Sequence, residues 1–123
     1  MKHILPLLLA VLMLFSAYNH LANPDFYSAM IPSFIPEAFA NVLSTILEAA
    51  IGIALIIPKY RQWGGLGFFL LMIAFLPLHI WDLLKESPMV GSKNAAIIRL
   101  VIQFVLIYLG WRIWKRYELE NNS

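Results

Sequence analysis

Four long apolar stretches constrain the fold of this chain more than any other feature. They cover approximately residues 4–21, 39–57, 64–84 and 95–114. Each is close to the ~20 residues that an α-helix needs to cross the hydrocarbon core of a bilayer. Hydrophobic residues make up 61% of the chain, whereas soluble domains are roughly 45–50% apolar. We therefore expect an all-α fold, a four-transmembrane-helix bundle that forms one membrane domain over residues 1–123 and spans the cell membrane several times.

Composition also excludes several classes of function. The chain contains no cysteine, which removes disulfides, thiolate metal sites and thiol-relay chemistry carried by the chain itself. Its net charge is only +2, and no basic cluster is interleaved with exposed aromatic residues. A nucleic-acid partner is therefore not expected, and the lipid bilayer is the partner that the composition favours.

The connection between the first two apolar stretches, residues 23–37, has an unusual composition. It carries three prolines, Pro24, Pro32 and Pro36, and large apolar side chains that include Phe26, Tyr27, Met30 and Phe34. This segment is too apolar for a solvated linker and too interrupted for a span. We expect a re-entrant or interfacial segment, the alternative being a plain surface loop. Residues 58–63 are expected to form a tight basic turn, and residues 85–94 a polar loop.

The distribution of Lys and Arg predicts the orientation of the bundle. One side of the predicted membrane holds Lys2, Lys59, Arg61, Arg112, Lys115 and Arg116, and the other holds Lys85, Lys93 and Arg99. The positive-inside rule then places both termini in the cytoplasm, with a cytoplasmic tail at residues 115–123. The first stretch resembles a signal peptide because Lys2 precedes it, but its apolar core is long and no clean cleavage site follows. We expect a retained span.

A carboxylate, Glu48, lies inside the second apolar stretch. An ionised side chain at the centre of a membrane helix costs roughly 2.5–3.5 kcal/mol, so Glu48 requires a partner or a role. With the alternating helix directions, other polar side chains fall at a similar depth, in the outer half of the bundle. The predicted ligand-binding residues are Asn19, His20, Glu48, His79, Arg99 and Gln103. Their convergence between apolar walls is typical of a small-ligand site.

Each of these residues also has a structural interpretation. Glu48 and Arg99 can form an ion pair that fixes helix register, or Arg99 can extend to the outer head groups. Gln103 can join two helices by a hydrogen bond, both histidines can be interfacial, and Asp82 can be solvated. His20, Glu48 and His79 have suitable ligand atoms for a metal, but their spacing gives no HExxH-type signature. We predict no metal site and assign no catalytic residue.

The order of several short segments resembles the DoxX-like family of small four-helix integral membrane proteins. The segments are residues 19–27 (NHLANPDFY), 30–36 (MIPSFIP), 47–58 (LEAAIGIALIIP), 75–80 (FLPLHI) and 99–103 (RLVIQ). The resemblance covers most of the chain, from about Leu12 to Arg116. The chain departs from the family pattern at His79, where Asn is usual, and at Leu21, where Phe is common. The resemblance implies redox-associated membrane proteins, including membrane parts of quinone-reducing systems and non-catalytic assembly partners.

Two functions follow as expectations. The first is a quinone-linked redox protein, or the membrane subunit of an oxidoreductase system, with a quinone head group held in the outer half of the bundle. A redox partner protein or a diffusible donor would then supply the electrons. The alternative is a non-catalytic membrane scaffold or an assembly chaperone, and whether the protein is an enzyme stays open. Small residues at Ser44, Ala54, Gly64 and Gly67 are available for helix contacts within one chain or in a homo-oligomer.

Overall fold

A computed structural model describes residues 3–85 and 92–121, and these residues contain four long helices and no strand. The elements are α1 (Ile4–Ala22), η1 (Pro24–Met30), α2 (Glu37–Ile56), η2 (Pro58–Tyr60), α3 (Arg61–Leu84) and α4 (Lys93–Asn121), where η marks a 3₁₀ segment. The predicted all-α four-helix architecture is confirmed. Each of the four helices is long and apolar enough to cross a membrane.

The helix boundaries lie close to the predicted ones, with one exception. Helix α4 continues to Asn121, beyond the predicted boundary at residue 114. Ion pairs one turn apart support this extension, at 3.6 Å between Lys115 and Glu118 and at 3.9 Å between Arg116 and Glu120. Such i, i+3 and i, i+4 pairs stabilise exposed helical turns by a few tenths of a kcal/mol. The polar tail is thus helical as far as the described residues extend.

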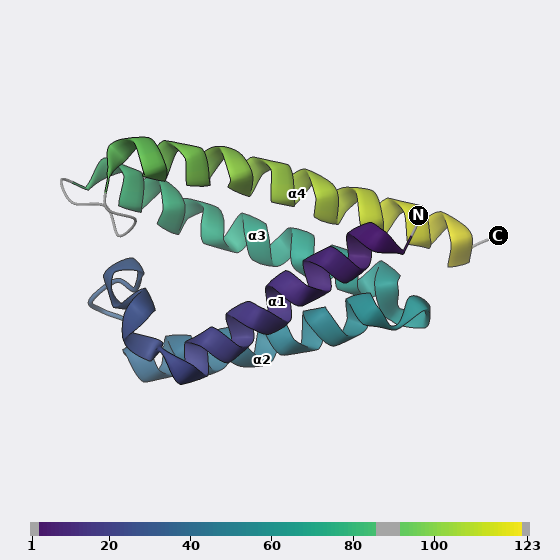
Figure 1. Ribbon diagram of the computed structural model, residues 1–123, viewed down its shortest axis with the longest axis horizontal. Coiled ribbons are helices and arrows are strands. Elements are labelled where there is room, and N and C mark those ends of the chain that lie inside the picture. The colour runs from purple at the N-terminus through teal and green to yellow at the C-terminus, as the bar shows by residue number, and fades with distance from the viewer. Residues whose placement is uncertain (1–2, 86–91, 122–123) are drawn as a thin grey trace.

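The four helices form two antiparallel hairpins, α1 with α2 and α3 with α4 (Figure 1). The hairpins contact each other through α2 and α3. In Figure 1 they meet at the end that carries both termini and stand apart at the end that carries η1. The apolar core lies toward the terminal end, where Leu9, Met13, Leu55, Phe68 and Ile113 pack together. The η1 end of the bundle thus lies outside this core.

Glycines allow the closest approaches between helices. A Cβ at Gly110 would lie 2.9 Å from the backbone nitrogen of Phe69, and one at Gly65 would lie 2.6 Å from that of Trp114. These two positions bring α3 and α4 together. A Cβ at Gly64 would lie 2.9 Å from the backbone nitrogen of Leu55, so that glycine joins α3 to α2. Gly64 therefore serves a contact within the chain.

Arg61 departs from its predicted place in a tight basic turn. Its residue surface is only 2% exposed, because it lies against the carboxyl end of α2. Its Nε donates to the carbonyl oxygen of Leu55 at 2.6 Å, and Nη2 donates to that of Ile56 at 3.1 Å. The last carbonyl groups of a helix lack partners within the helix, and a guanidinium fork can satisfy two of them at once. Arg61 thereby ends α2 and starts α3.

The outer faces of the helices are apolar. Along α1, the exposed side chains Leu8, Val11, Phe15 and Tyr18 recur at helical spacing on one face. Helix α4 presents a similar face that includes Ile98, Val101 and Val105. Water-soluble monomers rarely expose contiguous apolar surface on this scale, whereas lipid-facing helices do so as a rule.

Candidate functional site

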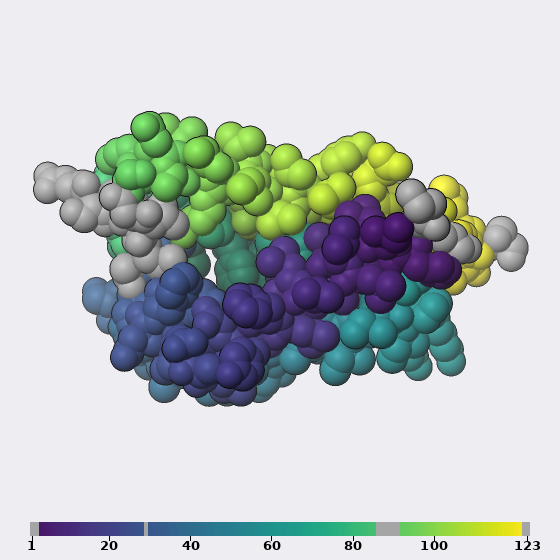
Figure 2. Space-filling view, in the orientation of Figure 1, coloured from purple at the N-terminus to yellow at the C-terminus, as the bar shows by residue number. Residues whose placement is uncertain are grey.

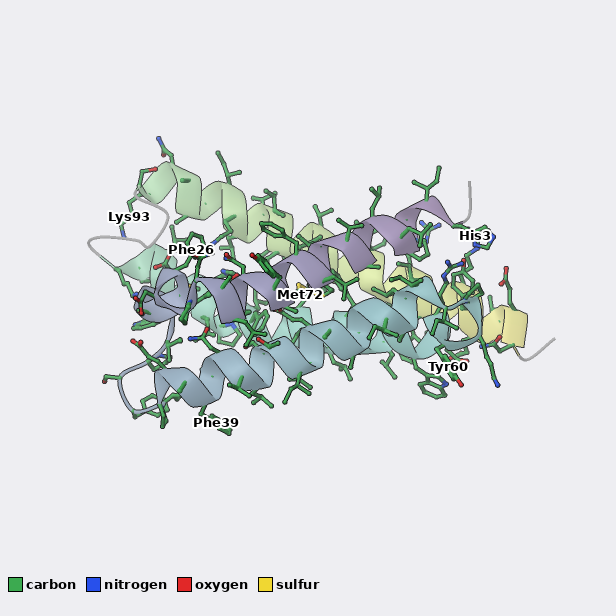
Figure 3. The ribbon with its side chains drawn as sticks, turned by 60° about the horizontal axis from the view of Figure 1, so that its bottom comes forward. His3, Phe26, Phe39, Tyr60, Met72 and Lys93 are labelled. Carbon is green, nitrogen blue, oxygen red and sulfur yellow. The ribbon has the colours of Figure 1, made fainter. Side chains whose placement is uncertain are left out.

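A cavity of about 280 Å³ lies between the two hairpins, next to η1. Figure 2 shows the corresponding recess between α1 and the first half of α4, with α3 visible behind it. In Figure 3, Phe26 marks the η1 end and Met72, which lines the cavity, lies midway along the bundle. The polar residues that line the cavity are Ser16, His20, Tyr27, Asn41, Ser44, Glu48, His79, Arg99 and Gln103. All the predicted ligand-binding residues except Asn19 are among them.

Glu48 is the most deeply buried charged group of the cavity lining, with 2% of its surface exposed. Its Oε1 lies 3.6 Å from Nε2 of His20, across the α1–α2 contact. Its Oε2 is buried and has no hydrogen-bond partner among the described residues. A buried acceptor without a partner is costly, by about 1–3 kcal/mol. This oxygen is therefore the strongest indication that the cavity is built to receive a polar group.

His20 is held in place on two sides. Its Nδ1 lies 2.8 Å from Oδ1 of Asn41, and its ring stacks on Tyr27 with centroids 3.8 Å apart. Tyr27 is in turn fixed by Asn19, whose side-chain nitrogen donates to the phenol oxygen at 3.0 Å. Asn19 therefore positions the ring stack from outside the cavity, although the sequence placed it among the ligand-binding residues.

Asn41 determines which nitrogen of His20 carries hydrogen. Its Nδ2 donates to the carbonyl oxygen of Pro24 at 3.4 Å, so Oδ1 must be the atom that faces His20. An amide oxygen only accepts, and the facing Nδ1 must therefore donate. Nε2, the nitrogen that faces Glu48, then carries hydrogen only when the ring is an imidazolium.

Asn41 was missed at the sequence level, although a signal for it exists. Asn41, Thr45, Glu48 and Gly52 follow one another at spacings of four, three and four residues, which places them on one face of α2. Thr45 donates to the carbonyl oxygens of Ala17 and Asn41, so this face is turned toward α1. A polar residue on the face of Glu48, two turns away, belongs to the same site.

Arg99 is paired with Asp82 rather than with Glu48. Its Nη2 lies 2.7 Å from Oδ2 of Asp82, which is fully buried, and 3.4 Å from the sulfur of Met30. Two structural interpretations of the sequence are thereby wrong: Glu48 and Arg99 do not form the register pair, and Asp82 is not solvated. Glu48 and Arg99 do line the same cavity, as their predicted positions along the helices indicated. Position along a helix alone, however, cannot decide which acid on a neighbouring helix pairs with Arg99.

Arg99 still presents one free donor near the cavity. Its Nε is buried and has no hydrogen-bond partner among the described residues. The side chain of Arg99 is 21% exposed, and the residue lines the cavity from α4. The guanidinium carries a hydrogen on Nε at all relevant pH values. Arg99 can thus bind Asp82 with one edge and a ligand acceptor with another.

Gln103 and His79 complete the polar lining from α4 and α3. Gln103 donates from Nε2 to the carbonyl oxygen of Met72 at 2.7 Å, so it joins the two helices as one interpretation of the sequence predicted. His79 has a buried Nδ1 without a partner among the described residues. Over residues 3–85 and 92–121, no cluster of three His, Asp or Glu side chains is arranged to hold a metal ion.

Comparison with known proteins gives a family but no activity. Residues 9–114 match the family described as Domain of unknown function (DUF8561). The chain belongs to this family. The match contains every residue that lines the cavity, from Leu12 on α1 to Leu106 on α4. No curated protein and no solved structure matches the chain.

The lining of this DUF8561 site is mainly apolar, with a few polar groups set into it. Three buried atoms of the lining residues lack a hydrogen-bond partner among the described residues: the acceptor Glu48 Oε2, the donor Arg99 Nε and the imidazole Nδ1 of His79. The wall between them is formed by side chains such as Leu12, Phe75 and Leu106. Such an arrangement can orient a small head group by two or more hydrogen bonds and enclose it in apolar surface.

Proposed function

We propose that this protein is an integral membrane protein that binds the head group of a quinone-type lipid-soluble compound in the cavity between its hairpins. In this role it is a redox-associated protein or the membrane subunit of an oxidoreductase system. The observation that carries the proposal is a pair of buried atoms in one apolar-walled cavity, Glu48 Oε2 and Arg99 Nε, neither of which has a partner among the described residues. A head group that offers a donor to Glu48 and an acceptor to Arg99 would satisfy both atoms.

Membrane insertion is supported by the four long apolar helices and by their exposed apolar faces. The orientation that we propose has both termini in the cytoplasm, as the excess of Lys and Arg at that end favours. The cavity then lies in the outer half of the bundle. For η1 and the residues up to Pro36 we propose an interfacial position, supported by the exposure of Phe26 and Phe34.

The size of the cavity favours a head group over a whole lipid. Pockets for drug-sized ligands range from about 300 to 1,000 Å³, and this cavity of about 280 Å³ is at the lower limit. A six-membered ring with its oxygen substituents fits that scale, and an attached apolar tail would leave between the hairpins toward lipid. The resemblance to the DoxX-like family, whose members are redox-associated, favours the same chemistry.

The proposal is tested by asking whether a quinone is bound by the purified protein. Lipid extracts of protein purified in mild detergent are analysed by mass spectrometry, and binding of a short-chain quinone/hydroquinone couple is measured by calorimetry. We expect binding by the wild type and at least tenfold weaker binding by Arg99→Gln. The matched control is Arg112→Gln on the exposed surface near the opposite end. Absence of binding of both redox forms to the wild type would refute the proposal.

A non-catalytic scaffold is the second candidate, because several polar residues of the site are already engaged. Arg99 binds Asp82, and Gln103 binds the backbone of Met72, so both hold helices together. A scaffold would use the site for structure alone and would dock its partner elsewhere. In that case the protein would bind neither quinone nor hydroquinone, and Glu48→Gln and Arg99→Gln would change only the free energy of unfolding, which they would lower.

A further inference from the structure

Three buried atoms of the cavity lining have no hydrogen-bond partner among the described residues, and they differ in whether they donate or accept hydrogen bonds. Arg99 Nε is a permanent donor, because the guanidinium keeps its hydrogens throughout the accessible pH range. It requires an acceptor on the ligand. The buried Nδ1 of His79 can donate or accept according to the tautomer of its ring, so it does not select between ligands. The atom that selects is therefore Oε2 of Glu48.

Glu48 Oε2 is an acceptor whichever partner holds the proton, as long as that proton lies between Oε1 of Glu48 and Nε2 of His20, which are 3.6 Å apart. Asn41 fixes the hydrogen on Nδ1 of His20, so Nε2 faces Oε1 of Glu48 either as an imidazolium donor or as a bare lone pair. In the first arrangement Glu48 is ionised and both of its oxygens accept. In the second, the proton sits on Oε1 and points at Nε2, and Oε2 is the carbonyl oxygen of the acid. Both arrangements leave a lone pair on Oε2 without a donor among the described residues.

A ligand that satisfies the cavity must therefore donate to Glu48 and accept from Arg99. A quinone has carbonyl oxygens, which only accept, and it would place one lone pair against another at Oε2 or leave that oxygen unpaired. A hydroquinone hydroxyl can donate, and its oxygen can also accept. We infer that the cavity binds the reduced, hydroxyl-bearing form of a quinone-type compound in preference to the oxidised form, an inference that rests on the proposed function.

The preference is one of binding, and no electron transfer is part of it. The ratio of the two affinities follows from the one hydrogen bond that the hydroquinone donates to Glu48 and that the quinone cannot donate. Losing the donor to a buried acceptor, here one on a residue only 2% exposed, weakens binding by about tenfold or more. A dimethyl ether of the same hydroquinone keeps the ring and the acceptor oxygens but lacks the donors, so it should bind no better than the quinone.

The test compares three ligands on the wild-type protein in detergent micelles: a short-chain benzohydroquinone, its quinone and its dimethyl ether. Calorimetry is carried out without oxygen so that the hydroquinone stays reduced. We expect the hydroquinone to bind at least tenfold more tightly than either of the others. Equal affinities, or tighter binding of the quinone, would overturn this inference and leave the proposed function standing. Absence of binding by both the hydroquinone and the quinone would overturn the proposed function itself.

Two variants then test whether Glu48 causes the preference for the hydroquinone. Glu48→Gln should reduce the ratio between hydroquinone and quinone affinities to threefold or less, because an amide can turn a donor toward the cavity. Glu118→Gln, the same chemical change near the opposite end of α4, should leave the ratio unchanged. A ratio that survives Glu48→Gln would overturn the assignment. Should that variant fail to fold, the three-ligand comparison on the wild type still decides the inference.

Discussion

Asp82 and Arg99 form an ion pair of 2.7 Å that joins the last turns of α3 to the first turns of α4. The carboxylate is fully buried, and Lys85 lies 3.6 Å from its other oxygen. Because Arg99 is committed to this contact, it does not neutralise Glu48, whose Oε1 lies 3.6 Å from Nε2 of His20 instead. Glu48 and Asp82 thus have separate partners on separate hairpins.

The first prediction concerns this separation. Asp82→Asn should lower the free energy of unfolding by about 3 kcal/mol, because it leaves a partly buried guanidinium without its carboxylate. The double exchange Asp82→Arg with Arg99→Asp should recover part of the stability that is lost when this pair is broken. The double exchange Glu48→Arg with Arg99→Glu should recover none of the stability that Arg99→Glu loses alone. Unfolding in mild detergent, followed by circular dichroism, measures all of these variants. Asp25→Asn on the exposed η1 segment is the matched control, with a change under about 0.5 kcal/mol expected.

The second prediction concerns the hydrogen on His20. In the wild type, Nδ1 should carry a hydrogen at every pH, because Oδ1 of Asn41 accepts from it. Nitrogen-15 NMR of the imidazole rings measures this, with the His20 signals assigned by their loss in His20→Gln. Asn41→Leu should allow the Nε2–H tautomer, while Asn121→Leu at the far end should not. A bare Nδ1 in the wild-type protein would contradict the assigned orientation of Asn41.

The third prediction concerns the approach of α3 to α4. Gly110→Ala should destabilise the protein by about 1–3 kcal/mol, because the new Cβ would meet backbone atoms of Phe69 that cannot move aside. Gly67→Ala is a matched control, since its Cβ would meet only the side chain of Ile51, at 3.1 Å. In detergent, the thermal unfolding midpoint of Gly110→Ala should lie well below that of Gly67→Ala. Equal losses of stability would show that α3 and α4 separate readily to admit the new Cβ.

The fourth prediction concerns Arg61. Arg61→Lys keeps the charge but loses the planar fork that binds the carbonyl oxygens of Leu55 and Ile56. We expect a loss of about 1–2 kcal/mol in unfolding free energy. Arg112→Lys, whose side chain is exposed and donates to Tyr108, should change stability by less than about 0.5 kcal/mol. Similar values for the two variants would mean that the end of α2 is stabilised by other contacts.

The fifth prediction concerns the proposed orientation in the membrane. The chain has no cysteine, so a single introduced thiol gives labelling without background. Phe34→Cys, at an exposed position between η1 and α2, should react with a membrane-impermeant maleimide added to intact cells. Asn121→Cys at the end of α4 should react only after the membrane is opened. The reverse pattern would invert the orientation that the basic residues favour.

The four helices of this protein could be predicted from sequence, because long apolar stretches indicate helices of membrane-spanning length. The predicted boundaries of the first three are within three residues of the observed ones, and the cavity lies where the polar residues of the four helices converge. Depth along a helix follows from counting residues at ~1.5 Å each, so His20, Glu48 and Arg99 could be placed at one level without knowing how the helices pack.

The pairing of these residues could not be read in the same way. It depends on the rotation of each helix about its axis, and Asp82, Glu48 and Arg99 allow more than one pairing at the same depth. The sequence predicts a tight basic turn that includes Arg61, whereas the burial of Arg61 follows from the need of the last carbonyl groups of α2 for partners. Asn41 was overlooked because it lies near the start of α2, where polar residues are common.

Gly64 allows α3 to approach α2 closely at Leu55. From Leu55 to Glu37, at ~1.5 Å for each of roughly 18 residues, α2 extends for about 27 Å. A tilt of α2 by about 5° about this contact would shift its distant end by about 2 Å, which is comparable to the radius of a methyl group. A larger side chain at Gly64 would push the two hairpins apart, and the width of the cavity would then depend on a residue that does not line it.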